Sequence, residues 1–143
     1  MERAIPEDGR VHGVIVACPR EDGRWLLIRR SRRERFAPLA ICFPGGKAEP
    51  GESARDTAVR EMREELGIGV EALRLVWRHA IPESNLVLWG VVARLESTAF
   101  VLEPAEVDEA LWMTLDEAAK HPEALPSTVP FVEALRGHAT HST

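Results

Sequence analysis

Residues 46–68, GKAEPGESARDTAVREMREELGI, form the stretch that most strongly determines the fold. They predict a loop followed by an amphipathic helix over Ser53–Leu66. Ser53 is a favoured N-cap residue, and Asp56, three positions later, completes a capping box. Gly67 suits the left-handed conformation in which many helices end. The sequence therefore predicts both ends of this helix as well as its centre.

Three glutamates of this helix are expected to share one face. Glu61, Glu64 and Glu65 stand at positions i, i+3 and i+4, which 3.6 residues per turn bring together. Like charges at this spacing repel one another, but hard oxygen donors are what Mg²⁺ or Mn²⁺ prefers. The alternative is a solvated acidic face, the usual outcome for a pair such as Glu64-Glu65 alone. The adjoining apolar face, expected to pack on a sheet, consists of Ala58, Val59, Met62 and Leu66.

The sequence outside this helix predicts mainly β-strands. Pro19–Gly23 is expected to form a hairpin turn between the first two strands, and Phe36–Cys42 a less regular strand that the following Pro and Gly residues interrupt. Further helices are expected at Leu115–Lys120 and Pro130–Arg136, followed by a flexible polar tail over residues 137–143. The main predicted strands are Val11–Cys18, Trp25–Arg30, Leu73–Ala80, Leu86–Leu95 and Ala110–Met113.

This order of elements predicts an α/β fold. Strands and helices are mixed without strict alternation, so we expect a mixed sheet with helices on both faces. A length of 143 residues suits a single domain over residues 1–143.

Composition limits the kinds of partner. The chain is 45% hydrophobic and 29% charged, and no apolar run approaches the roughly 20 residues of a membrane helix. Residues 1–10 lack the apolar stretch of a signal peptide, so we expect a cytoplasmic protein without a membrane partner. The net charge of -5 argues against binding a nucleic-acid polymer. Cys18 and Cys42 have no nearby Cys or His in ligand spacing and are expected to be buried free thiols.

Residues 46–68 resemble the Nudix box, G-x5-E-x7-R-E-U-x-E-E-x-G-U, in which U is aliphatic, and every fixed position matches. The resemblance is expected to extend over residues 8–136. It implies an α/β/α sandwich in which the box forms a loop–helix–loop. It also implies a hydrolase that cleaves the diphosphate linkage of a small nucleotide-like molecule with the help of Mg²⁺, for which Mn²⁺ can substitute.

The resemblance also assigns roles within the box. Glu61, Glu64 and Glu65, with the carbonyl of Gly46, would bind the metal ion. Glu52 and Arg60 would brace the loop against the helix, because a guanidinium fork can hold a carboxylate in place. Attack by water on a phosphorus atom would need a base, and Glu61 is the expected one by analogy with MutT-like members. Other branches of the family take the base from a loop outside the box.

The MutT-like branch is the favoured resemblance for the substrate. Phe-Pro-Gly-Gly-Lys at residues 43–47 matches that branch, as does the spacing from Glu106, a further candidate metal ligand, to Trp112. Residues 125–130 resemble the loop that contacts the purine, with Thr128 as a candidate substrate-binding residue where the branch has Asn. The branch implies hydrolysis of nucleoside triphosphates to the monophosphate and pyrophosphate, and one hydroxyl in place of a carboxamide implies modest base selectivity. A solvated acidic turn is the other interpretation of Glu106.

A second, partial resemblance is to the coenzyme A diphosphatase branch. The run Leu26-Leu-Ile-Arg-Arg-Ser31, followed by Arg35, keeps the spacing of that branch, with Ile28 and Leu39 as departures. Arg30 and Arg35 are therefore candidate substrate-binding residues, and coenzyme A, ADP-ribose or a dinucleotide is the alternative substrate. A ligand sensor without turnover is the alternative of another class. The sequence leaves monomer and homodimer open.

Overall fold

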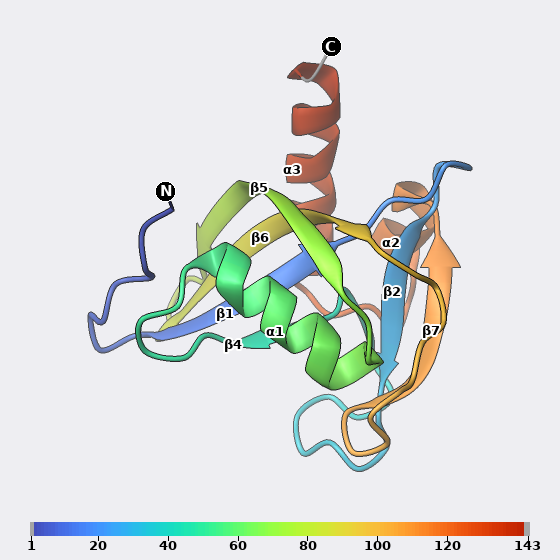
Figure 1. Cartoon of the computed structure of the whole chain (residues 1–143), viewed down its shortest axis with the longest axis horizontal. Helices are drawn as coiled ribbons and strands as arrows, with labels where there is room; N and C mark the ends of the chain where they lie inside the picture. The colour runs from blue at the N-terminus through green and yellow to red at the C-terminus, as the bar shows by residue number, and fades with distance from the viewer. Residues whose placement is uncertain (1, 142–143) are drawn as a thin grey trace.

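The computed structural model describes residues 2–141, which form seven strands and three helices (Figure 1). The amino-terminal half contains β1 (Val11–Ala17), β2 (Trp25–Arg30), β3 (Ile41–Cys42), β4 (Gly45–Lys47) and α1 (Ala54–Leu66). The carboxy-terminal half contains β5 (Val70–Ala80), β6 (Leu86–Leu95), β7 (Val107–Met113), α2 (Leu115–Lys120) and α3 (Thr128–His141).

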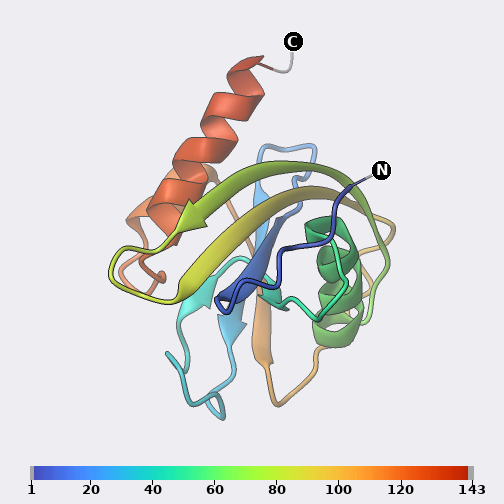
Figure 2. The same cartoon turned by 90° about the vertical axis from the view of Figure 1, so that its left-hand side faces the viewer.

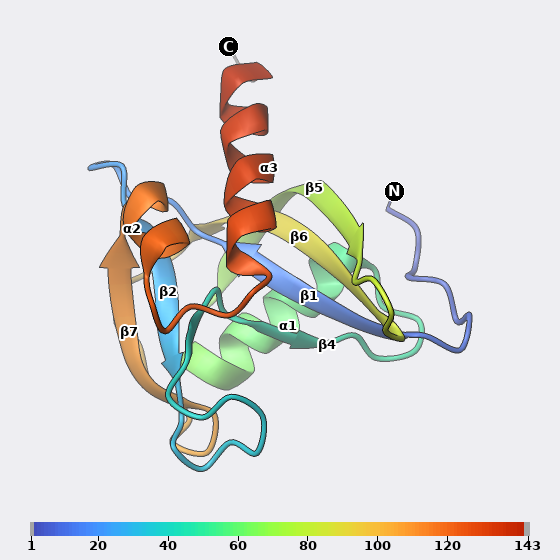
Figure 3. The same cartoon turned by 180° about the vertical axis from the view of Figure 1, so that it is seen from behind.

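The strands form two sheets. The first has the order β4-β1-β6-β5 and is mixed, because β1 runs parallel to β6 and antiparallel to β4. The second has the order β3-β2-β7 and is antiparallel throughout. Figures 1 and 3 show β2 and β7 side by side at one end of the larger sheet. The predicted α/β class with a mixed sheet is confirmed, whereas the division into two sheets was not foreseen.

The turn between β1 and β2 forms as predicted, but the two strands separate. The amide of Arg20 donates to the carbonyl of Arg24 at 2.7 Å, and Leu26 donates to Cys18 at 3.0 Å. Beyond this turn β1 already has β4 on one edge and β6 on the other. No edge of β1 remains for β2, which therefore pairs with β3 and β7 instead.

Helices cover both faces of the larger sheet (Figure 2). On one face α1 buries Ala58, Met62 and Leu66 in a core that includes Val14 and Val91. On the other face α2 and α3 close a second core, which contains Phe43, Phe131 and Leu135 among others. Val59 was wrongly predicted to belong to the buried face of α1, because it lies on the solvent side with 37% of its surface exposed.

The other differences from the predicted elements lie at their ends. Only Ile41 and Cys42 of the predicted strand Phe36–Cys42 are extended, because Ala37 and Leu39 have left-handed backbones with φ of 45° and 66°. Strands β5 and β7 begin earlier than predicted, and the short strand β4 was missed. Helix α3 continues beyond Arg136 to His141, so the first part of the predicted tail is helical. Residues 142–143 lie outside the described residues, and the flexibility of the tail stays a prediction.

The two cysteines, Cys18 and Cys42, are buried free thiols, as predicted. Burial raises the pKa of each thiol to about 12. Across residues 2–141, none of the helices combines the length and the apolar character needed to cross a membrane.

An aromatic cluster fixes α3 against the larger sheet. The ring of Phe131 stacks on Trp77 with 5.2 Å between centroids and meets the edge of Phe43 at 4.9 Å. The same ring lies directly against the backbone of Gly90 in β6, where a Cβ atom would overlap it. Gly90 therefore lets α3 approach the sheet closely enough for Phe131 to be fully buried.

We expect Gly90→Ala to destabilise the fold by about 1–3 kcal/mol, because the added methyl group forces Phe131 out of this packing. The free energy of unfolding in urea measures the effect. Gly137→Ala is the matched control, since a Cβ atom there meets nothing within 4 Å. This control should instead stabilise α3 by up to ~1 kcal/mol. Equal stability of Gly90→Ala and the unchanged protein would show that the ring adjusts without cost.

Candidate active site

The loop and helix predicted from residues 46–68 form as expected. The Ser53 side chain accepts a hydrogen bond from the Asp56 amide at 3.0 Å, and Asp56 accepts from the Ser53 amide at 3.2 Å. Gly67 ends α1 in the left-handed conformation, with φ of 65°. Before the loop, Gly45–Lys47 pairs with β1, so the start of the box is part of the larger sheet. Both ends of the segment are therefore anchored.

Arg60 is the centre of the hydrogen-bonding network that joins the loop to the helix. Its guanidinium holds Glu52 with two bonds, from Nε at 2.7 Å and from Nη2 at 3.0 Å. Nη2 also donates to the Lys47 carbonyl at 2.8 Å. Nη1 donates to Glu61 at 2.9 Å and to Glu64 at 3.1 Å. These are the bracing contacts expected for Glu52 and Arg60.

Glu52 is held in its ionised form. Besides the contacts from Arg60, it accepts hydrogen bonds from the Glu49 amide at 2.8 Å and from the Thr57 hydroxyl at 2.9 Å. Arg60 first, and then these donors, lower the pKa of the Glu52 carboxyl to about 2. A carboxylate so fully occupied by donors from its own chain is suited to fixing the loop, not to exchanging a proton.

Glu61 and Glu65 are the two buried carboxyls of α1, with 7% and 6% of their surfaces exposed. Glu65 accepts a hydrogen bond from the Gly45 amide at 2.9 Å. Burial nevertheless raises the pKa of Glu65 to about 8, and the Gly45 amide offsets only part of that effect. Burial also raises the pKa of Glu61, against the opposing contact from Arg60. Both carboxyls are thus short of positive charge.

Two glycines allow close packing around β4. A Cβ atom at Gly46 would overlap the Glu61 carboxylate, so only glycine leaves room for it. A Cβ atom at Gly45 would overlap the Val14 carbonyl of β1. Gly46 therefore permits the close approach of β4 and α1, and Gly45 permits the close pairing of β4 with β1.

Glu64 does not join the buried pair. Its side chain is 52% exposed and turns toward Arg60, whereas all three glutamates were predicted to converge. Nη1 of Arg60 lies between Glu61 and Glu64 and donates to both carboxylates, which offsets only part of the effect of burial on Glu61. Within residues 2–141, no three His, Cys, Asp or Glu side chains are grouped so that they could hold a metal ion together.

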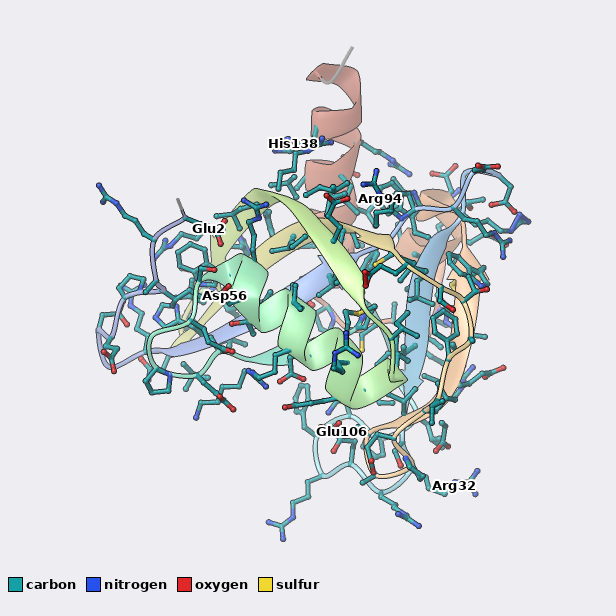
Figure 4. The ribbon with its side chains drawn as sticks, viewed as in Figure 1. Glu2, Arg32, Asp56, Arg94, Glu106 and His138 are labelled. Carbon is teal, nitrogen blue, oxygen red and sulfur yellow. The ribbon has the colours of Figure 1, made fainter. Side chains whose placement is uncertain are left out.

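Glu106 lies near the carboxyl-terminal end of α1, opposite the end that Asp56 marks (Figure 4). Its charge helps to raise the pKa of both Glu61 and Glu65. Burial, followed by the charges of Glu34 and other nearby glutamates, raises the pKa of Glu106 itself. The structure thus brings this residue, predicted from its spacing to Trp112, into the electrostatic field of the box.

The donor set fits a hard divalent cation. The residues are carboxylates, two of them buried, and their raised pKa values reflect a deficit of positive charge that such a cation would remove. The space that Gly46 leaves beside the Glu61 carboxylate would be filled by any larger residue. The identity of the ligands stays a prediction.

A cavity of about 310 Å³ opens beside the box. Glu65, Gly45 and Gly46 line one part of it, and the remaining walls are mostly apolar. Of the candidate substrate-binding residues, Thr128 and Arg30 line this cavity. Arg35 is exposed and is not among the lining residues of the part of the chain that is described.

Several lining residues were not predicted from the sequence. The hairpin formed by β5 and β6 contributes Ile81, Leu86 and Leu88. The hydrophobic pattern of this segment predicted a strand, but it did not show that these side chains face a cavity. Phe36 was predicted to belong to a strand. Its position directly after a run of arginines was a signal that could have indicated a residue of the cavity wall. These residues give the cavity its apolar character.

Comparison with known proteins gives consistent matches. A model of the NUDIX domain matches residues 9–135. The CTP pyrophosphohydrolase of Escherichia coli (strain K12) is 34% identical over 122 residues, which cover 85% of this chain and 89% of that protein. The NAD-capped RNA hydrolase NudC of Pseudomonas putida (strain GB-1) is 33% identical over 104 residues, which cover 73% of this chain but only 36% of that longer protein.

Solved structures agree with the sequence matches. A MutT NUDIX hydrolase from Burkholderia pseudomallei is 27% identical with a TM-score of 0.72, covering 87% of this chain and 96% of that one. The E. coli ORF135 protein is 26% identical with a TM-score of 0.71, covering 93% of this chain and 94% of that one.

We expect Glu65→Gln to raise the melting temperature of the metal-free protein by roughly 5 °C at pH 8.5. The folded-state pKa of about 8 lies above the ordinary value of 4.5, so the folded protein binds this proton more tightly than the unfolded chain. Stability is therefore lost as pH rises through the window from 4.5 to 8, and glutamine escapes that loss. The amide oxygen can still accept from Gly45.

Thermal unfolding in EDTA at pH 4.5 and 8.5 measures this difference, which should nearly vanish at the lower pH. Glu21→Gln, at an exposed position, serves as the control and should not differ from the unchanged protein. An equal melting temperature of Glu65→Gln and the unchanged protein at pH 8.5 would show that burial does not penalise the ionised carboxyl.

Proposed function

Because the chain belongs to the NUDIX domain family and is a Nudix hydrolase, we propose that its substrates are nucleoside triphosphates. It would cleave them to the nucleoside monophosphate and pyrophosphate in a reaction that depends on Mg²⁺. The observation that carries this proposal is that Glu65 and Gly46 line the same cavity as Thr128 and a mostly apolar wall. Such a cavity can hold a flat base at one end while the phosphates reach the box carboxylates at the other.

The proposed metal ligands are Glu61, Glu64 and Glu65, with the Gly46 carbonyl, and Glu106 is a further candidate. Bound there, the ion would neutralise phosphate oxygens, orient the attacking water and stabilise the leaving group. Glu64 is exposed and bound to Arg60, so it would have to change this contact to join the buried pair.

Glu61 is the proposed base for the attacking water. Burial raises its pKa, which makes the carboxylate more basic than an exposed glutamate and closer in pKa to neutral pH. Arg60 would hold Glu61 in position through its Nη1 bond of 2.9 Å. Glu52, fixed by the same guanidinium, would keep the loop that contains Gly46 in register with the helix.

The choice of nucleoside triphosphates has support from a relative. The CTP pyrophosphohydrolase is similar over nearly the full length of both proteins. Thr128, buried at the start of α3, offers the base one hydroxyl. A single hydroxyl cannot donate and accept in a bidentate manner, so we infer only modest discrimination among bases.

Coenzyme A, ADP-ribose or a dinucleotide is the alternative substrate, and its basis is the run of arginines from Arg29 to Arg35, at the end of β2 and in the loop after it. Several of these arginines are engaged by acids of their own chain. Arg29 contacts Glu109 and Glu123, at 3.3 and 3.2 Å, and Arg32 contacts Asp108 at 3.4 Å. This pairing lowers their availability for phosphates and favours the triphosphate proposal. A sensor without turnover is disfavoured because every carboxylate of the box is present.

We expect Arg60→Lys to lower turnover at least tenfold with little change in KM. Lysine cannot reproduce the two-pronged contact with Glu52 together with the bonds to Glu61 and Glu64. Steady-state kinetics separate the two parameters. Arg63→Lys, at an exposed position of the same helix, is the control and should retain normal kinetics. A rise in KM at unchanged turnover would instead assign Arg60 to substrate binding.

A substrate panel with Mg²⁺ tests the proposed function directly. It contains nucleoside triphosphates, oxidised purine triphosphates, coenzyme A, ADP-ribose, NADH and diadenosine polyphosphates. We expect triphosphates to be cleaved fastest, with orthophosphate appearing only after inorganic pyrophosphatase is added. Preference among purine triphosphates should be less than about tenfold, as one missing hydrogen bond of ~1 kcal/mol implies.

Glu64→Gln is the inactive comparison for the panel. It should lose at least about a hundredfold in turnover while remaining folded, because the amide removes a charge assigned to the metal ion. Faster cleavage of coenzyme A or ADP-ribose than of any triphosphate would refute the substrate proposal.

A further inference from the structure

Phe36 is exposed to an extent unusual for a phenylalanine that lines a cavity. It is 68% exposed, yet it lines the same cavity as Glu65, Gly46 and Thr128. It comes from the loop between β2 and β3, whereas most of the apolar wall comes from strands and from residues before α3. Core packing does not account for a ring so exposed, so the side chain is free to contact a ligand that enters the cavity.

The loop that carries Phe36 is tied to the end of β2 through Arg30. The Arg30 guanidinium donates from Nε to the Phe36 carbonyl at 3.0 Å, and its Cζ lies over the phenyl ring at 5.5 Å from the centroid. The backbone of Arg30 accepts from the Leu39 amide at 3.1 Å and donates to the Ala40 carbonyl at 2.8 Å. The exposed ring is therefore held in a defined place.

The loop that carries the ring has an unfavourable backbone conformation. Ala37 and Leu39, on either side of Pro38, have φ of 45° and 66°, in the left-handed region that residues with a Cβ atom avoid. The loop thus combines two strained residues with an exposed apolar ring. Strain of this kind persists at functional sites, where the surrounding structure maintains it.

We propose that Phe36 is the residue on which the nucleobase of the substrate stacks, a role that rests on the proposed function. Arg30 lies over the phenyl ring and helps to hold it, and the base packs against the exposed part of the ring. The phosphates then extend along the cavity toward Gly46 and Glu65. Every base has a π-face, so recognition by stacking is strong but tolerant of base identity. This complements the single hydroxyl of Thr128.

Substitution of Phe36 tests the proposal, with ATP and CTP as substrates. Phe36→Leu keeps the apolar character but removes the aromatic face, and should raise KM about tenfold with turnover changed less than about twofold. Phe36→Tyr keeps the face and should restore KM to near its original value. Stacking also predicts a larger rise for ATP than for CTP, because a purine presents the larger face.

Leu39→Ala is the matched control. Leu39 belongs to the same loop and is 41% exposed, but it is not among the described residues that line the cavity. Its substitution should leave KM unchanged. An unchanged KM in Phe36→Leu, or an equal rise in Phe36→Leu and Leu39→Ala, would overturn the proposal, since a general disturbance of the loop would then account for the result.

The test separates this proposal from the proposed function. If no triphosphate is hydrolysed, the proposed function fails, but stacking can still be measured by calorimetry as binding of AMP. Weaker binding of AMP to Phe36→Leu than to Phe36→Tyr would then support stacking. Equal binding to the two variants, or AMP binding to neither of them nor to the unchanged protein, would reject it.

Discussion

The contact on which the site depends is the forked pair between Arg60 and Glu52. It joins a residue in the middle of α1 to a residue of the preceding loop, and the same guanidinium also reaches Lys47 at the end of β4. The two side chains are about a fifth exposed, which weakens the attraction relative to a buried pair. Its bidentate geometry and the additional donors to Glu52 nevertheless make it more than an isolated surface ion pair. Together with the Thr57 hydroxyl bond to Glu52 and the Gly45 amide bond to Glu65, it holds the loop and the helix in a common register.

Because the loop and the helix are held in register, the fold can maintain two buried carboxyls that are energetically unfavourable. Glu61 and Glu65 are buried with too few donors, and each carries a free-energy penalty when it ionises. The two apolar cores on opposite faces of the larger sheet supply the stability that offsets this penalty. Gly46 permits the close approach of Glu61 to β4, so the penalty at this carboxyl arises from the packing of the helix against the strand. A hydrolase that needs a cation can retain such carboxylates because the cation removes the penalty when it binds.

The sequence predicted the centre of the site better than its surroundings. The capping residues and the glutamate spacing of α1 are local signals, and so they predicted the helix and the acidic face, but not the burial of Glu61 and Glu65. Periodicity predicted that Glu61 and Glu64 share a helix face, and both reach Nη1 of Arg60, but it cannot show that Glu64 stays exposed while Glu61 is buried. The division into two sheets depends on β1 using both of its edges, a long-range fact with no local signal. The orientation of Phe36 likewise depends on the left-handed residues that follow it, and neither of those is a glycine.

Helix α3 makes two different contacts through residues that lie one turn apart. Phe131 anchors it in the aromatic cluster over Gly90, and Thr128 forms part of the cavity wall. The opposite part of that wall belongs to β4 and α1, which are joined by Arg60. The contact between Phe131 and Phe43 links the two parts, because Phe43 lies two residues before β4. Local unfolding of α3 would therefore remove the wall that contains Thr128 and would also uncover the aromatic side chain beside the strand that leads into the box.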